Sequence, residues 1–519
     1  MTTTVLGFRP NLPPATSVEA VFETKNAMKA GDNAVSASAA KSPNRVFRLV
    51  LYDGLASEAM GTLTAGVLLA GFAVELGASN FAIGILAAVP FLIQLLQIPA
   101  VILVEHWRDR RRICVRVCFI GRLFLLACSA VPFLGSAGVA ALIGLLTVYQ
   151  GAGAIGGCAW NSWMRDLVPS AEYGRFFARR TAATTALATA LAYGASVLID
   201  LWRRDFPAQS GLVYSALFVL SALIGFLGVY LLSITPDAPM APRERPIDLC
   251  ALFTAPFHDR NFRRLIVFLS SWSFAVNLAA PFFAVYMLKS LGYGMSTVMI
   301  LTIASQSANL ASLGIWGSLC DRFSNKAVLS VAAPLFLVCI LGWTSTGLSW
   351  VHGMTFYLLF AIHLLMGFST AGVALASNNI AMKLSPAGQA TSYLAANSVV
   401  SAFFAGIAPM IGGLCADFFA AHQLTLAFTW AGEAQALTVQ VLNFHAWTFL
   451  FGIACVVGLY SLHRLAWIEE AAGSADPLVL RDLLLEARRS LLNLSSAAGL
   501  LRIVRSPVYF LRQRAAQRV

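Results

Sequence analysis

Ionisable side chains lie within long apolar stretches of this chain, where a charge is costly. Glu58 lies about seven residues into the first stretch, Arg122 about ten into the third, and His363 is in the tenth, and a charge at mid-membrane costs roughly 2.5 to 3.5 kcal/mol on insertion scales. A carboxyl group whose surroundings alternate between dry and charged can take up and release a proton. We therefore predict that Glu58 exchanges a coupling proton, with His363 and Asp53 as further candidates.

Each of these residues also has a structural explanation. Glu58 shares a helix face with small residues such as Gly54, and an ion pair with Arg122 explains its retention equally well. An unpaired guanidinium at mid-membrane is implausible, so Arg122 is expected to be the buried charge partner of Glu58 or of an anionic substrate, with the structural role favoured. A hydrogen-bonded core position is favoured for His363. A role at the level of the lipid headgroups is favoured for Asp53, which lies near the start of its stretch.

Polar side chains recur at helical spacing in other apolar stretches. In lipid such a stripe must face protein or water, so we favour a polar cavity over hydrogen bonds between neighbouring helices. The substrate-path candidates on these stripes are Asn277, Gln306, Asn309, Tyr393 and Asn397. The fourth stretch adds one aromatic candidate, Trp160.

The elements that position these residues follow from composition. Of the 519 residues, 58% are hydrophobic and 12% charged, and the mean hydropathy is +0.74, far outside the range of soluble globular proteins. Twelve apolar stretches between about Val50 and Trp467 are long enough to cross a hydrocarbon core of roughly 30 Å as helices. The alternation typical of barrel strands is missing. We predict an all-α integral membrane protein with twelve transmembrane helices.

Basic residues predict the orientation of these helices. If the N-terminus is cytoplasmic, all but four of the 36 Lys and Arg residues fall in or beside cytoplasmic segments. The four exceptions are Arg122, Arg203, Arg204 and Lys289. The chain is therefore predicted to be multi-pass with both termini cytoplasmic, in the plasma or inner membrane. The net charge of +12 reflects this bias, so no nucleic-acid partner is expected.

Other chemistries find little support in the sequence. The nine cysteines form no CxxC pair and most lie inside apolar stretches, so we expect packed thiols, no metal site and no cofactor. A phosphate-binding loop of the form GxxxxGK[ST] is absent, which argues against an ATP-driven pump. The protein is not expected to be an enzyme.

The chain divides into two related halves. Its longest Pro-rich interruption, TPDAPMAPRERP, follows the sixth stretch. Landmark residues recur about 216 positions apart, as Glu105 with Asp321 and Pro169 with Pro386 do, which suggests two pseudo-symmetric bundles around a central path. The predicted parts are a cytoplasmic N-terminal tail (1–49), a six-helix bundle (50–234), a cytoplasmic linker (235–261), a second six-helix bundle (262–467) and a basic amphipathic cytoplasmic tail (468–519).

A charged loop follows the eighth stretch. Its residues Gly317, Asp321, Arg322 and Lys326 have the order and spacing of a loop signature of the major facilitator superfamily, which this chain resembles. The resemblance implies a gate latch at the cytoplasmic surface. In such a latch Asp321 pairs with cations of another inner segment and stabilises the outward-open state, because charge-assisted bonds can form and break as the halves rock.

The first half carries weaker matches to the same superfamily. Glu105 stands at the acidic position of the corresponding loop, and Asp166 with Pro169 matches the loop after the fourth helix. Drug exporters of the superfamily usually carry an arginine where this chain has Thr147, and their Gly-Pro-rich signature is absent from the fifth stretch. Drug antiport is therefore permitted but not supported.

The resemblance implies a function as well as a fold. We expect a secondary active transporter that moves a small organic solute by alternating access, coupled to protons, with membrane lipids around a monomer. The alternatives are a drug or metabolite exporter and a transporter-like sensor or scaffold that no longer transports. A degenerate first loop and the basic C-terminal extension keep the last alternative open.

Overall fold

The computed structural model describes residues 43–237, 249–346, 353–386, 389–431 and 436–470. Nearly all of the predicted N-terminal tail and of the predicted basic tail lies outside these ranges. Within the described part, 12 helices are long and apolar enough to cross a membrane, from Arg45–Glu75 to Trp447–Ala466. The predicted twelve-helix membrane fold is confirmed.

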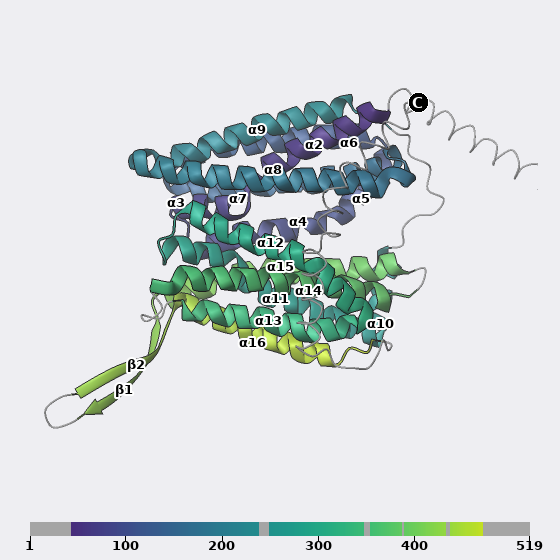
Figure 1. Ribbon diagram of the computed structural model, residues 1–519. Coiled ribbons are helices and arrows are strands. Elements are labelled where there is room, and N and C mark those ends of the chain that lie inside the picture. The colour runs from purple at the N-terminus through teal and green to yellow at the C-terminus, as the bar shows by residue number, and fades with distance from the viewer. Residues whose placement is uncertain (1–42, 238–248, 347–352, 387–388, 432–435, 471–519) are drawn as a thin grey trace, which may run out of the picture.

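The first half contains six spans, most of them bent or interrupted (Figure 1). Proline lacks the amide hydrogen that a helix needs, so the third span gives way to a 3-10 turn that contains Pro132. The elements of this half are α2 (Pro43–Thr64), α3 (Gly66–Glu75), α4 (Asn80–Ile93), η1 (Gln94–Leu96), α5 (Gln97–Trp107), α6 (Arg110–Ala127), η2 (Cys128–Phe133), η3 (Gly135–Ala137), α7 (Gly138–Leu167), α8 (Ser170–Asp205), η4 (Pro207–Gln209) and α9 (Ser210–Ile234).

The second half contains six spans that are mostly continuous helices, preceded by a short helix in the predicted linker, α10 (Leu249–His258). Asp259 caps the first of these spans, because its carboxylate accepts hydrogen bonds from two backbone N–H groups of the first turn. The spans are α11 (Arg260–Lys289), α12 (Met295–Arg322), α13 (Asn325–Ser345), α14 (Thr355–Leu384), α15 (Ala390–Ala420) and α16 (Ala446–Ala466).

The first span is broken between α2 and α3, although the sequence predicts one continuous helix there. Gly66 adopts a φ of 59°, which glycine tolerates better than any other residue. The hydroxyl of Thr64 donates to Met60 O at 2.9 Å, so the end of α2 is partly capped from within. The break redirects α3, which packs against α11 and α12 of the other half.

A β-hairpin lies between the last two spans and projects from the helices (Figure 1). Its strands, β1 (Gln423–Ala431) and β2 (Ala436–His445), pair antiparallel with one register shift at Leu426/Ala427. The sequence predicts that the last span begins near residue 440, whereas the structure begins α16 at Ala446. The six residues 440–445 therefore belong to a strand and not to the helix, and a two-stranded hairpin alone is only marginally stable in water.

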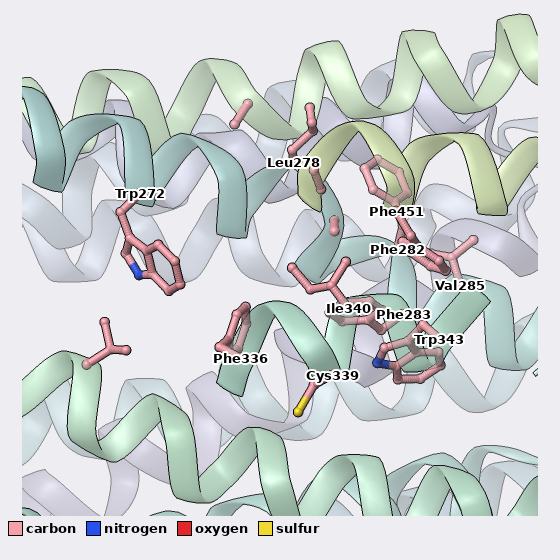
Figure 2. Close-up of a cluster of buried hydrophobic side chains, with 14 of the residues drawn as sticks. Trp272, Leu278, Phe282, Phe283, Val285, Phe336, Cys339, Ile340, Trp343 and Phe451 are labelled. Atoms are coloured by element: carbon pink, nitrogen blue, oxygen red, sulfur yellow. The ribbon is translucent and has the colours of Figure 1, made fainter. Parts of the chain in front are cut away.

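An aromatic core holds the second half together (Figure 2). The ring of Phe283 stacks on Trp343 with 4.5 Å between centroids, and Phe451 of α16 packs on both at 5.1 and 6.1 Å. Apart from these rings, Figure 2 shows Trp272 of α11 facing Phe336 of α13, with centroids 5.8 Å apart. This second aromatic pair becomes one wall of a cavity.

The two halves meet along α4 with α15 and along α8 with α12 (Figure 1). Glycine permits the first contact, because a Cβ at Gly84 would collide with Pro409 O and one at Gly413 with Asn80 O. These contacts lie toward the end of the bundle that carries residues 76–79, 206–209, 290–294 and 421–422, which we call the closed end. We call the opposite end, with residues 108–109, 168–169, 323–324 and 385–386, the basic end.

Candidate functional site

A polar cavity lies inside the second half, with a volume of about 340 Å³. Its wall is formed by α11, α13, α14 and α15, so four helices must pack correctly to build it. The lining residues are Leu269, Trp272, Ser273, Val276, Phe336, Thr370, Val373, Ala374, Ser377, Asn378, Asn397, Ser398 and Ser401. None of these side chains carries a formal charge, so the cavity offers hydroxyl and amide groups beside aromatic and aliphatic faces.

Three polar atoms in this wall are buried and have no hydrogen-bond partner in the described chain: Ser377 Oγ, Asn397 Oδ1 and Ser401 Oγ. Other hydroxyls of the same half are bonded to their own helix, as Ser369 Oγ is to Met366 O at 3.1 Å. An unsatisfied buried polar atom costs about 1 to 3 kcal/mol. Atoms that stand open in a cavity wall are therefore suited to bind water or a polar ligand.

The first half buries charges instead. Asp53 is 2% exposed and Arg122 is 6% exposed. Both face α9: Asp53 Oδ1 would lie 3.7 Å from a Cβ at Gly228, and Arg122 packs over Gly225. Asp53 is therefore packed between helices and not exposed on the surface, and its predicted position at the level of the headgroups stays a prediction. Arg122 is likewise a buried group between helices, with the ring of Tyr149 6.0 Å from its guanidinium carbon.

Glu58 is exposed, and it lies within electrostatic reach of Arg180 of α8. Arg180 packs directly over Gly54, which shares a helix face with Glu58, and its Nε donates to Val50 O at 3.3 Å. Its guanidinium carbon lies 4.8 Å from the ring centroid of Trp160. Arg180 interacts electrostatically with both Glu58 and Asp53. Among the described residues, the predicted ion pair of Glu58 with Arg122 is not formed, and Arg180 is the cation whose electrostatic interaction with Glu58 the structure shows. In the sequence, Arg180 is one of a group of basic residues beside a predicted loop, so this role was not predicted.

Of the predicted substrate-path residues, Asn397 lines the cavity and Asn277 lies next to its wall. The Asn277 amide donates to Ser273 O at 2.8 Å. Tyr393 is 5% exposed and packs edge-on against Phe262 at 4.7 Å, so it belongs to the core. Gln306 is exposed on α12, and Asn309 of the same helix is half-buried; neither is among the residues that line the cavity.

His363 also occupies a core position, as the favoured interpretation of the sequence predicts. Its Nδ1 lies 2.8 Å from Leu359 O, one turn earlier on α14, and its ring packs on Trp343 at 5.4 Å. The residue is 6% exposed. A hydrogen-bonded histidine held against an aromatic ring is explained by packing alone.

Among the predicted latch residues of the second half, Lys326 binds within that half. Lys326 Nζ donates to Ala466 O at 3.0 Å and to Ile468 O at 2.7 Å, at the end of α16. Asp321 and Arg322 are exposed, and the guanidinium of Arg322 lies over the ring of Phe323. Gly317 has only Leu375 near it, 3.9 Å from an added Cβ.

At the basic end of the first half, the buried side chain of Arg110 joins two helices. Arg110, which is 2% exposed, donates to Asp166 Oδ2 at 2.5 Å and to Ser162 O at 2.8 Å. Glu105 is half-buried at the end of α5, within electrostatic reach of Cys158. The contacts of Arg110 join α6 to α7. Among the described residues, Asp321 forms no ion pair with the first half in this conformation, and the predicted latch stays a prediction.

A twelve-span helical protein with two six-helix halves, one of which encloses a cavity with polar groups in its wall, has the architecture of a membrane transporter. The family model of the Major Facilitator Superfamily matches residues 54–409. The chain therefore belongs to the major facilitator superfamily, and it is an integral, multi-pass membrane transporter. No curated protein matches it.

Solved structures with the same fold agree with this assignment. The nucleoside transporter NupG superposes with a TM-score of 0.59 at 12% identity, covering 82% of this chain and 99% of its own. A bacterial homologue of the iron transporter ferroportin, in an inward-facing state, gives 0.58 at 12% identity, with 82% and 98% covered. The D-xylose–proton symporter gives 0.55 at 13% identity, again with 82% and 98% covered.

Proposed function

We propose that the protein is a secondary active transporter that takes up a small, uncharged, polar organic solute by alternating access. The observation that carries this proposal is the cavity in the second half, with three buried polar atoms that lack partners in the described chain and no charged side chain in its wall. Neutral donors and acceptors match hydroxyl and amide groups of a ligand, and Trp272 with Phe336 offers rings on which a flat or cyclic solute can pack.

The conformation fits one state of such a cycle. If basic loops stay on the cytoplasmic side, the basic end is cytoplasmic and the closed end faces outward. The two halves then touch on the outer side, as expected for an inward-facing state. In the opposite state the latch at Asp321 is expected to form, which agrees with the exposed position of Asp321 here.

Proton coupling is assigned to Glu58. This carboxylate is exposed, lies within one turn of Gly54, and shares Arg180 with the buried Asp53. Protonation of Glu58 weakens its attraction for Arg180, and release of the proton restores it, so the position of Arg180 on α8 depends on the proton. Because α8 contacts α12 of the other half, this change reaches the interface between the halves.

Uptake into proteoliposomes tests the proposal. A thermal-shift screen over nucleosides, pentoses, hexoses and polyols selects a ligand, and its labelled form is then offered with and without an inward proton gradient. Accumulation that collapses with the gradient supports coupled uptake. Equal uptake with and without proton and sodium gradients overturns active coupling.

Export of an amphipathic metabolite is the second candidate, favoured by the aromatic part of the cavity wall. Efflux of the solute that an inward proton gradient stimulates distinguishes export from uptake. A scaffold without transport is distinguished by cysteines placed at Asn277 and Asn397. Both react with a soluble thiol reagent from alternating sides if a path opens, whereas a protein that never opens leaves them unreactive from one side under all conditions.

A further inference from the structure

Two carboxylates at the closed end each bind the beginning of a helix in the other half. Asp200, near the end of α8, accepts hydrogen bonds from the backbone N–H groups of Met295 and Ser296 at 2.8 Å each. It also accepts one from the Ser296 hydroxyl at 2.5 Å. Asp200 belongs to the first half, and the helix that it caps, α12, belongs to the second.

The reciprocal contact is made by Asp417, near the end of α15. Its two oxygens accept hydrogen bonds from the backbone N–H groups of Asn80 at 3.0 Å and Phe81 at 2.9 Å, in the first turn of α4. Here the carboxylate comes from the second half and the capped helix from the first. Asp200 and Asp417 are 217 positions apart, the spacing of the internal repeat, so the two contacts are copies related by the pseudo-symmetry of the fold.

Neighbouring acids at this end are engaged differently. Glu75 pairs with Arg203 and accepts from Ser210, and Asp205 pairs with Arg204, all within the first half. The first four N–H groups of a helix lack partners within it and carry a partial positive charge, so a carboxylate at that position is stabilising. For Asp200 and Asp417 this stabilisation exists only while the halves touch.

We propose that Asp200 and Asp417 form a reciprocal pair of latches that holds the closed end shut and must be released in every transport cycle. The inference rests on the alternating access proposed above and adds the residues that set its equilibrium at this end. Both bonds span the same interface, so a rigid-body movement breaks them together and their contributions multiply. Loss of one such cap is expected to favour opening about fivefold, and loss of both about 25-fold.

Distances between spin labels measure this equilibrium. Labels at Phe206 and His422, two exposed positions at the closed end of opposite halves, are introduced on a background from which the native cysteines have been replaced. The variants are Asp200→Ala, Asp417→Ala and the double variant. Their Asn counterparts keep an acceptor oxygen and are expected to shift less. Asp205→Asn, an exposed acid at the same end, is the matched control.

The expected result is a longer-distance population that grows about fivefold in each Ala variant and about 25-fold in the double variant, with Asp205→Asn unchanged. If the parent protein alternates with pH or ligand while the double variant has the same populations as the parent, the latches are refuted and alternating access stands. A single distance in every variant and condition refutes alternating access itself, and the latches with it. An equal shift in Asp205→Asn also refutes the latches, because a general loss of negative charge then explains the effect.

Discussion

The two halves of the molecule bury different kinds of polar group. The first half encloses formal charges, namely Asp53, Arg110 and Arg122. In the described part of the second half, the buried polar residues are serines, threonines, one asparagine and His363, with no Asp, Glu, Lys or Arg among them. A pseudo-symmetric backbone thus buries Asp and Arg side chains in one half and, apart from His363, only hydroxyl and amide groups in the described part of the other. The contrast suggests that the first half senses the proton and the second half binds the solute.

The largest effect is expected from replacing Glu58, which tests whether the first half senses the proton. Glu58→Gln is expected to reduce gradient-driven accumulation at least tenfold while exchange of solute down its own gradient continues, because the amide resembles the neutral acid but releases no proton. Accumulation and exchange are both measured in proteoliposomes. Glu172→Gln, an exposed acid in the first turn of α8, is the control and should leave both unchanged.

A double variant decides whether Glu58 is structural instead. If Glu58 serves only as the counter-ion of Arg180, Glu58→Gln lowers thermal stability and Glu58→Gln with Arg180→Gln recovers it. Recovery of both stability and accumulation in the double variant would show that no proton is exchanged at Glu58. The coupling role would then have to be sought elsewhere in the first half.

Because the first half buries charged side chains, its stability should fall when the ion-pair partner of such a side chain is removed. Asp166→Asn weakens the ion pair with Arg110, whose side chain is only 2% exposed, and is expected to lower the free energy of unfolding by about 2 kcal/mol. The measurement is the shift in Tm in detergent. Asp205→Asn breaks an exposed pair and should change stability by less than about 0.5 kcal/mol. Similar shifts in both variants would mean that Arg110 has other, sufficient partners.

The fold could be predicted from the sequence because apolar length and basic loops are local properties. The break at Gly66 could not, because a glycine that allows close packing and a glycine that allows a positive φ look alike in sequence. The hairpin at 423–445 was missed for a related reason: its apolar residues were partly assigned to the next span.

The candidate site was only partly predictable. Asn397 was predicted because polar residues of its stretch recur at helical spacing. Ser377 lines the same wall from another helix, α14, and was not among the candidates. Arg180 and Asp200 look like ordinary charges near helix ends. Their partners come from other spans, which only tertiary structure brings together.

In the second half, which buries neutral polar groups, substitutions in the cavity wall are expected to change the affinity for the solute and to leave proton coupling unchanged. Asn397→Ala removes an amide whose oxygen has no partner in the described chain, and is expected to weaken solute binding about tenfold, or about 1.4 kcal/mol. Ser377→Ala should weaken it less, because a hydroxyl makes fewer bonds. Asn309→Ala, outside the cavity wall, is the matched control. An unchanged Kd by calorimetry in Asn397→Ala would place the binding site elsewhere.

The smallest expected effect concerns the hydrogen bonds of Glu470 at the basic end of the second half. Glu470, just beyond α16, accepts hydrogen bonds from Lys326 N–H and Asn325 Nδ2 at 2.8 Å each and from Lys383 Nζ at 3.3 Å. Burial raises the pKa of Glu470, but these hydrogen bonds together hold it below its ordinary value of 4.5. A lowered pKa in the folded protein means that the ionised carboxylate stabilises the fold above about pH 4.5, and that this stability is lost as the pH falls through the lower, folded value.

Glu470→Gln is therefore expected to lower the free energy of unfolding by about 1 kcal/mol near neutral pH, about half the effect of Asp166→Asn. The difference from the parent should shrink as the pH falls below the ordinary carboxyl value, which Tm measurements over a pH series will detect. Glu469→Gln is the matched control, because this neighbouring carboxylate is 82% exposed where it pairs with Arg264. A constant difference at all pH values would mean that Glu470 contributes through shape and not through charge. The second half would then have no stabilising carboxylate charge at the start of α13. The contrast between charged groups in the first half and neutral polar groups in the second would then hold at the basic end as well.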